Sequence, residues 1–141
     1  MSHKQRIYRC PICDTTVETV QKLGVELTCC GPAMVRVGEK NAQQCSSSHR
    51  LKVEVTLDGV KVGVGDSSHP MRTHHHIAWI ELVSKDKRCR QFLQPGQPAE
   101  AVFPLTFAPV SVRALCSSHG LFKLAVASAS IRDSRPNALA A

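Results

Sequence analysis

Four cysteines within 21 residues constrain the fold of this chain more strongly than any other feature. They occur as CPIC-x15-CC and are Cys10, Cys13, Cys29 and Cys30. A Cys-x-x-Cys turn directs two sulfurs to one point, and a second pair completes the tetrahedral geometry of zinc or of a mononuclear iron–thiolate site. The alternatives are buried free thiols and disulfides, but adjacent cysteines have Cα atoms about 3.8 Å apart, below the usual disulfide range of about 4.4–6.8 Å. The spacing predicts a metal site and leaves zinc and iron open, although an adjacent pair is unusual for a zinc ribbon.

Residues 1–38 are predicted to form a separate module around these cysteines. The module offers only short extended runs, at 7–9, 16–20, 25–27 and 35–37, separated by the cysteine turns and by glycines. A module of under about 40 residues with few large apolar side chains usually needs a metal or a disulfide to fold. Residues 39–48, EKNAQQCSSS, are polar and are predicted to be a linker or a long surface loop.

Residues 49–127 are predicted to form an all-β domain. LKVEVTL alternates apolar and polar residues, and Asp58-Gly59 after it is typical of a hairpin turn. The further β-rich runs are 60–64, 76–83, 88–93, 100–103, 111–115 and 122–126. Short strands at this spacing favour a β-sandwich. Residues 128–141 lack a sustained pattern and are predicted to be a frayed tail.

Composition excludes several classes of protein. Of the 141 residues, 18 are Lys or Arg and 11 are Asp or Glu, which gives a net charge of +7. The basic residues are scattered, and one Trp, one Tyr and four Phe cannot form a stacking platform, so no nucleic-acid partner is expected. No apolar run is long enough for a membrane span, and the start MSHKQRIYRCPIC has no apolar core of a secretory signal. With an odd cysteine count, seven, we expect thiolates in the reducing cytoplasm.

Histidines form a second constellation with one cysteine. The tripeptide Ser-Ser-His recurs at 47–49, 67–69 and 117–119, which suggests loops that converge in space, and Cys116 and His119 have a ligand-like spacing. Neutral imidazoles with one thiolate suit iron, copper or zinc. In the triplet at 74–76, strand alternation modestly favours His75 as the buried member, on the face of Ile77 and Trp79.

Together these residues resemble the desulfoferrodoxin family, the two-iron class of superoxide reductase, over residues 8–123. Four blocks carry the resemblance, in the family's order: YRCPICDTTVE…GVELTCCGPAM, HPMRTHHHIAWIEL, QFLQPGQPAEAVF and CSSHGLFK. They match the family's desulforedoxin-like module, its HPM-x-x-x-H-x-I-x-W-I-E segment, its FL-x-PG segment and its C-x-x-HG-x-x-K ending. The resemblance implies a small desulforedoxin-like module followed by an immunoglobulin-like β-sandwich, in a homodimer.

The resemblance also implies the ligands of two mononuclear irons. One iron would be held by Cys10, Cys13, Cys29 and Cys30. The other would be held by four equatorial histidines and one axial cysteine: His49, His69, His75, His119 and Cys116. His75 is the member of the triplet that lies six residues after the histidine of HPM, and His49 is placed by its separation of 20 residues from His69. Cys45 and Cys89 have no family role and are expected to be packed or surface thiols.

The implied activity is the one-electron reduction of superoxide to hydrogen peroxide, with a rubredoxin-like electron donor. The chain departs from the family at one loop, where Ser47-Ser48 stand in place of Glu-Lys and Leu51 in place of a proline. The matching lysine of the family attracts superoxide by its charge, and Ser48 carries none. One alternative is therefore an iron-binding protein with little turnover. Another is a non-enzymatic iron- or zinc-binding or electron-transfer protein.

Overall fold

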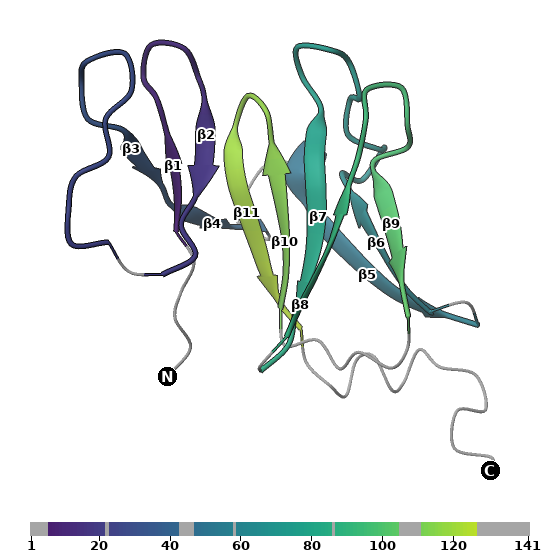
Figure 1. Cartoon of the computed structure of the whole chain (residues 1–141). Helices are drawn as coiled ribbons and strands as arrows, with labels where there is room; N and C mark the ends of the chain where they lie inside the picture. The colour runs from purple at the N-terminus through teal and green to yellow at the C-terminus, as the bar shows by residue number, and fades with distance from the viewer. Residues whose placement is uncertain are drawn as a thin grey trace. The chain divides into compact units, whose positions relative to one another are not determined.

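The computed structural model describes residues 6–21, 23–42, 47–57, 59–85, 87–104 and 111–126. Within these residues the structure is β-strands joined by turns and one short 3₁₀ turn. The chain divides into two compact units, Met1–Gly38 and Glu39–Ala141 (Figure 1). The all-β prediction is confirmed.

The first unit contains a three-stranded antiparallel sheet. Its strands are β1 (Ile7–Arg9), β2 (Thr16–Glu18) and β3 (Val35–Val37), in the order β2-β1-β3. The strand predicted at 25–27 is wrong, because this segment has no partner strand and Val25 is exposed. The chain there forms an isolated bridge between Thr28 and Ala33 and turns back through Cys30 and Gly31, both at positive φ.

The second unit is a sandwich of two sheets. The larger sheet has the order β4-β11-β10-β7-β8 and consists of β4 (Glu39–Asn41), β11 (Gly120–Ala125), β10 (Ser111–Cys116), β7 (Ile77–Val83) and β8 (Arg88–Phe92). The smaller sheet has the order β5-β6-β9 and consists of β5 (Leu51–Thr56), β6 (Gly59–Val64) and β9 (Glu100–Phe103). Neighbouring strands are antiparallel except β4, which pairs parallel to β11.

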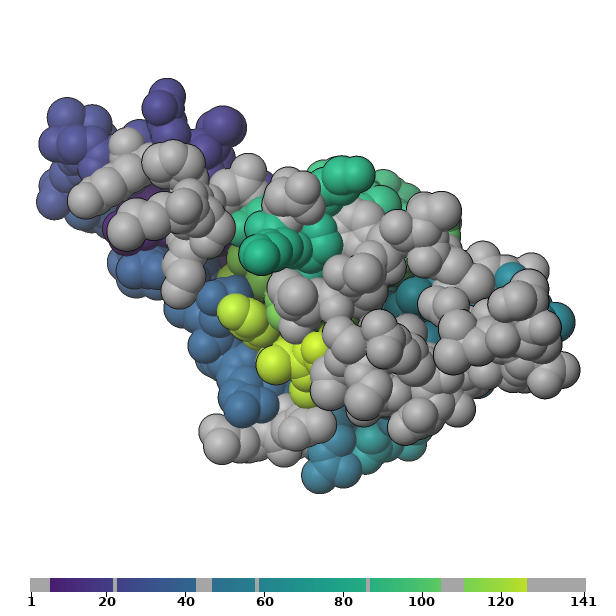
Figure 2. Space-filling view, turned by 90° about the horizontal axis from the view of Figure 1, so that it is seen from below, coloured from purple at the N-terminus to yellow at the C-terminus, as the bar shows by residue number. Residues whose placement is uncertain are grey.

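Strand β4 lies in the segment predicted to be a linker or loop. Its residue Lys40 pairs with Phe122 of β11, so residues 39–41 form an edge strand of the larger sheet. The polar sequence of residues 39–41 did not indicate a strand. All three residues of this edge strand are exposed, so it needs no alternation of apolar and polar residues. In the space-filling view, the yellow atoms of β11 reach the surface beside the blue atoms of the segment that contains β4 (Figure 2).

The core of the sandwich lies between the two sheets. It is built from every second residue of the strands, as in Val60, Val62 and Val64 of β6. Ile80 and Leu82 of β7 meet them from the larger sheet, all five being almost fully buried. Burial of this apolar surface is the main source of the unit's stability.

A β-bulge interrupts the start of β7, directly after the three histidines at 74–76. Cys116 pairs with Ile77 and Leu115 pairs with Trp79, so β7 has one extra residue there. Alternation predicted Ile77 and Trp79 on one face, and that prediction is wrong. Ile77 joins the core, whereas Trp79 packs against the guanidinium of Arg90, whose Cζ lies 3.9 Å from the ring centroid.

Glu81 follows Trp79 on the outer face of β7 and is buried in an ion network. Its carboxylate accepts hydrogen bonds from Arg113 at 2.6 and 2.8 Å and from Arg90 at 2.9 Å. Arg88 lies 3.4 Å away. A buried carboxylate is tolerated when it is paired in this way, and the network links β7, β8 and β10 across the outer face of the larger sheet.

Candidate metal centres

The first unit brings the four cysteines together. Their sulfurs lie within 4.8 Å of one another, with Cys13 Sγ 3.6 Å from Cys29 Sγ and Cys29 Sγ 3.9 Å from Cys30 Sγ. For metal–sulfur bonds of about 2.3 Å, the edge of a tetrahedron is about 3.8 Å. A disulfide has an S–S distance of about 2.05 Å. The spacing therefore fits a tetrahedral metal–thiolate site, and these four cysteines are free thiols.

Backbone amides face the sulfur of Cys10. The N–H groups of Ile12 and Cys13 donate to it at 3.4 and 3.5 Å, as a Cys-x-x-Cys turn requires. Cys13 Sγ is 3.0 Å from the hydroxyl of Thr15. This hydrogen bond is the main cause that lowers the pKa of Cys13 to about 6, whereas hydrogen bonding to Cys13 raises the pKa of Cys29 to about 12. The group thus favours a thiolate at Cys13, the form that binds metal.

In the second unit, four imidazoles form a four-sided ring. Ring centroids are 4.7 Å apart for His49 and His69, 4.6 Å for His69 and His75, 4.8 Å for His75 and His119, and 4.8 Å for His119 and His49. The diagonal from His49 to His75 is 6.3 Å. Four nearly equal sides, with His49 and His75 at opposite corners, make a closed four-cornered arrangement, the imidazole square. The three Ser-Ser-His segments do converge, as expected, since His49, His69 and His119 are three of its corners.

Cys116 supplies a thiol to this ring. The residue is 1% exposed, and its sulfur lies 3.5 Å from His69 Nε2 and 3.6 Å from His119 Nδ1. Cys116 ends β10, and His119 precedes β11, so one hairpin turn carries both. The five donor atoms lie within 4.8 Å of one another.

Hydrogen bonds turn the lone pairs of two imidazoles inward. His69 Nδ1 donates to the carbonyl of Pro70 at 2.7 Å, which leaves its Nε2 as an acceptor. His49 Nδ1 lies 3.1 Å from the hydroxyl of Ser48, which can accept the ring proton in the same way. The two Nε2 atoms face each other at 3.1 Å. Two nitrogens bound at right angles to one metal at about 2.1 Å are about 3.0 Å apart, so a cation fits between these lone pairs.

His75 supports the same fit. Its Nε2 is buried and has no hydrogen-bond partner, which is costly unless a ligand occupies that direction. Burial is the main cause that lowers the pKa of His49, to about 4, and it also lowers the pKa values of His69 and His75. Mutual repulsion of the imidazoles adds to this effect. His49, His69 and His75 are therefore neutral bases near neutral pH, as metal binding requires.

The segment that carries His49 approaches the segment that carries His69 closely. His49 ends the 3₁₀ turn η2 (Ser47–His49), whose Ser47 carbonyl accepts from the N–H of Asp66 at 2.9 Å. A Cβ on Gly65 would lie 2.9 Å from Ser48 O and 2.9 Å from His69 N, and Gly65 has φ +87°. Only glycine adopts this φ without strain and lacks the Cβ that would clash here, so Gly65 lets the two loops come together.

The loop at 74–76, which carries His75, is held by hydrogen bonds to the two serines after Cys116. Ser117 Oγ accepts from the N–H of His76 at 3.0 Å, and Ser118 Oγ donates to the carbonyl of His74 at 3.1 Å. The sequence pattern indicated a strand that begins within the triplet, but the triplet precedes β7. His74 is exposed, and neither His74 nor His76 belongs to the donor group.

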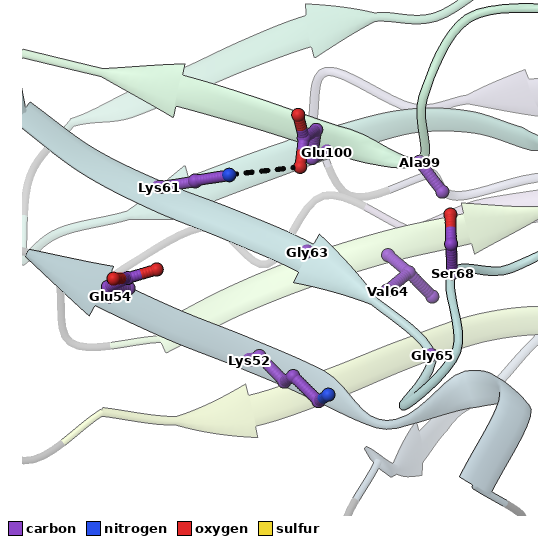
Figure 3. A pocket seen from close by; sticks show the side chains of 9 residues that line it. All are labelled: Lys52, Glu54, Lys61, Gly63, Val64, Gly65, Ser68, Ala99 and Glu100. Carbon is purple, nitrogen blue, oxygen red and sulfur yellow. Dashed lines mark ion pairs between the residues drawn. The ribbon is translucent and has the colours of Figure 1, made fainter.

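Two other cysteines were expected to have no ligand role. Cys89 is half-buried against the core of the second unit and belongs to neither donor group among the described residues. Cys45 lies outside the described residues. The open pocket on the smaller sheet is lined by residues of β5 and β6, by Ala99 and Glu100 and by the turn at 65–68, and it contains the Lys61–Glu100 ion pair at 3.2 Å (Figure 3). None of the nine predicted ligands lines it.

The fold and the two donor groups define a non-haem metalloprotein with a four-thiolate module and a four-imidazole, one-thiolate centre on a β-sandwich. A profile of the Desulfoferrodoxin family matches residues 40–125. The chain belongs to the desulfoferrodoxin family, and its donor groups match the family's two-iron pattern.

Individual relatives agree with this assignment. The desulfoferrodoxin of Syntrophotalea carbinolica is 40% identical over 122 residues, which are 86% of this chain and 97% of the relative. That of Nitratidesulfovibrio vulgaris is 37% identical over 123 residues, 87% and 98% of the two chains. The superoxide reductase from Treponema pallidum superposes with a TM-score of 0.66 at 23% identity, covering 87% of this chain and 98% of that one, which shows the shared fold. The described part of the chain contains no helix with the length and apolar character needed to cross a membrane.

Proposed function

We propose that the protein is a superoxide reductase that converts superoxide to hydrogen peroxide. The observation that carries the proposal is the square of four imidazoles with one buried thiol beside it. His49, His69, His75, His119 and Cys116 would hold one iron, and Cys10, Cys13, Cys29 and Cys30 the other. Iron bound at the histidine centre supplies one electron, which reduces superoxide with the uptake of two protons.

The protein's own residues prepare this chemistry. Five donor atoms would leave one position of a six-coordinate ion for a small anion. Cys116 is buried, so the negative charge that its sulfur would carry when bound to a metal would act with little dielectric screening. The ring of Phe122 stacks on His49 at 4.4 Å and an interplanar angle of 13°, which shields that imidazole from water. His119 is exposed and opens the centre to the solvent that supplies substrate and protons.

The resemblance supports three further proposals about the working protein. A rubredoxin-like protein would return the electron, the molecule would be a homodimer, and it would act in the cytoplasm. The four-cysteine centre would stabilise its small module and is a candidate relay for the electron. The exposure of Cys13 and Cys30 favours access of a donor to this centre.

A second candidate function is iron binding with little turnover. The observation in its favour is that Ser48, which stands where the family has lysine, is hydrogen-bonded to His49 and carries no charge. Both functions need the same centre, so only the rate and the product distinguish them.

The test combines iron analysis, absorption spectra and peroxide yield. Protein reduced under argon should oxidise on a pulse of superoxide and form one peroxide per superoxide, whereas dismutation gives one peroxide per two. Cys116→Ser should lose the thiolate charge-transfer band and the activity, and His75→Ala should lose iron. The matched control, His74→Ala, should keep both, because His74 lies outside the donor group. Slow oxidation with iron in place would favour the second function, and a colourless zinc protein would contradict both.

A further inference from the structure

The edge strand β4 places a lysine at the histidine centre. Lys40 Nζ donates a hydrogen bond of 2.7 Å to the backbone carbonyl of His119. The same ammonium lies 5.5 Å from the centroid of the Phe122 ring, within the range of a cation–π contact. Phe122 in turn stacks on His49. Lys40 is thus held beside two neighbouring corners of the imidazole square.

The charge of Lys40 is not neutralised by its neighbour in the sequence. Successive side chains of a strand point to opposite faces, and Glu39 turns to Arg113 at 3.5 Å and Lys123 at 4.0 Å. No carboxylate in the described part of the chain lies within ion-pair distance of Lys40.

We propose that Lys40 supplies the fixed positive charge that draws the anionic substrate to the histidine centre of this protein. The inference rests on the proposed function for the identity of the anion. Lys40 borders His119, the exposed corner of the ring, where an approaching anion first meets the centre. A positive charge at the mouth of a site raises the local concentration of anions. The residue before His49 is uncharged here, and Lys40 reaches the centre from a different strand.

The experiment compares three variants at Lys40 and one control in the iron-loaded, full-length protein. Lys40→Gln removes the charge but keeps a side chain that can donate to the His119 carbonyl, and Lys40→Arg keeps the charge. The control is Lys87→Gln, which changes the net charge equally. Lys87 is exposed and lies beyond the far end of β7, about 20 Å of strand away from Ile77. The third variant, Lys40→Glu, reverses the charge.

Two measurements are made at low and high ionic strength. The first is the second-order rate of oxidation by superoxide, and the second is the affinity of the oxidised protein for azide, a small anion that needs no turnover. We expect Lys40→Gln to lower both by about three- to tenfold at low salt and Lys40→Glu to lower them further. Lys40→Arg should retain most of the parent values. In about 1 M salt, where the Debye length is about 3 Å, the differences should shrink to within about twofold.

The failure of this inference is distinguishable from failure of the proposed function. Equal loss in Lys40→Gln and Lys87→Gln, or no loss in either, would overturn the role of Lys40 even if the parent reduces superoxide. A loss in Lys40→Gln that persists at high salt would assign a structural role instead. If the parent does not produce peroxide stoichiometrically, the proposed function fails, and the azide series still decides whether Lys40 attracts anions.

Discussion

At the scale of single residues, Ser48 has a role that its uncharged side chain did not suggest. Its hydroxyl lies 3.1 Å from His49 Nδ1, so it can hold the imidazole with Nε2 facing the other donors. Partners that orient a ligand histidine in this way contribute strongly to metal affinity. The resemblance implies a lysine at this position, so here a hydrogen bond to the proposed ligand His49 would take the place of a charge.

We expect Ser48→Ala to weaken iron binding at the histidine centre by about tenfold, because the ring of His49 loses its orienting partner. Ser48→Thr, which keeps the hydroxyl, should bind iron like the parent. Competition with a chelator at fixed pH measures both affinities. Ser48→Lys should raise the superoxide rate at low salt, with a gain that fades as ionic strength rises, and should share the weakened iron binding of Ser48→Ala. Unchanged iron affinity in Ser48→Ala would remove the orienting role.

The lowered pKa of His49 predicts how the stability of the metal-free protein depends on pH. In the folded chain this pKa is lowered by burial to about 4, below its ordinary value of 6.5, and those of His69 and His75 are lowered as well. Below pH 6.5 the unfolded chain therefore binds protons that the folded chain excludes. The contribution of these histidines to the free energy of unfolding is complete above about pH 6.5 and is lost as the pH falls toward 4.

Urea unfolding of chelator-treated protein between pH 7.5 and 4 measures this loss. The fluorescence of Trp79, the one tryptophan of the sequence, reports the second unit alone. The urea midpoint should fall steadily through the window, and His74→Ala, at an exposed position, should leave the slope unchanged. A midpoint independent of pH would contradict the neutral state of His49, His69 and His75.

At the scale of elements, the centre depends on how closely three turns approach one another. η2, the 65–69 turn and the β10–β11 hairpin each bring a Ser-Ser-His segment to the square. Backbone hydrogen bonds lock the first two together, including Gly65 N–H to the carbonyl of Arg50 at 2.7 Å. Gly65 is the position where this packing leaves no room for a side chain.

We expect Gly65→Ala to destabilise the second unit by about 1–3 kcal/mol, because φ of +87° is strained for alanine and its Cβ meets two backbone atoms. The clash should also move His49 away from His69, so the variant should bind less iron at this centre. Gly63→Ala is the matched control, since Gly63 lies in β6, has no positive φ, and leaves the position of a Cβ free of other atoms within 4 Å. Urea unfolding and iron content measure both variants. Equal behaviour of the two would show that the turns can move apart at no cost.

At the scale of the whole molecule, each donor group lies within one compact unit. The four cysteines belong to Met1–Gly38, and the histidine group belongs to Glu39–Ala141. Each unit has its own sheets and its own backbone hydrogen bonds. The two metal centres should therefore be separable by mutation.

We expect Cys13→Ser to lower the iron content from about two to about one per chain, because three thiolates no longer close the tetrahedron. The absorption of the four-cysteine centre should disappear. Oxidation of the other iron by superoxide should persist, since its ligands lie in the other unit. Spectra and metal analysis of the folded variant check this, with Cys89→Ser as the control cysteine outside both groups. Loss of both spectra in a folded protein would contradict two independent centres.

The sequence by itself determined which metal-binding groups this protein carries and the class of its fold. Cysteine spacing and strand alternation are local properties, so they indicated the four-thiolate module, most of the strands and, with the family resemblance, the donor sets. Tertiary structure decided what depends on partners distant in the chain. Strand β4 exists because β11 offers an edge, the bulge at Ile77 exists because β10 sets the register, and His75 is inward because its turn is tied to Ser117 and Ser118. Lys40 is the clearest case, since a lysine in a polar segment acquires its place only when β4 pairs with the strand that follows His119.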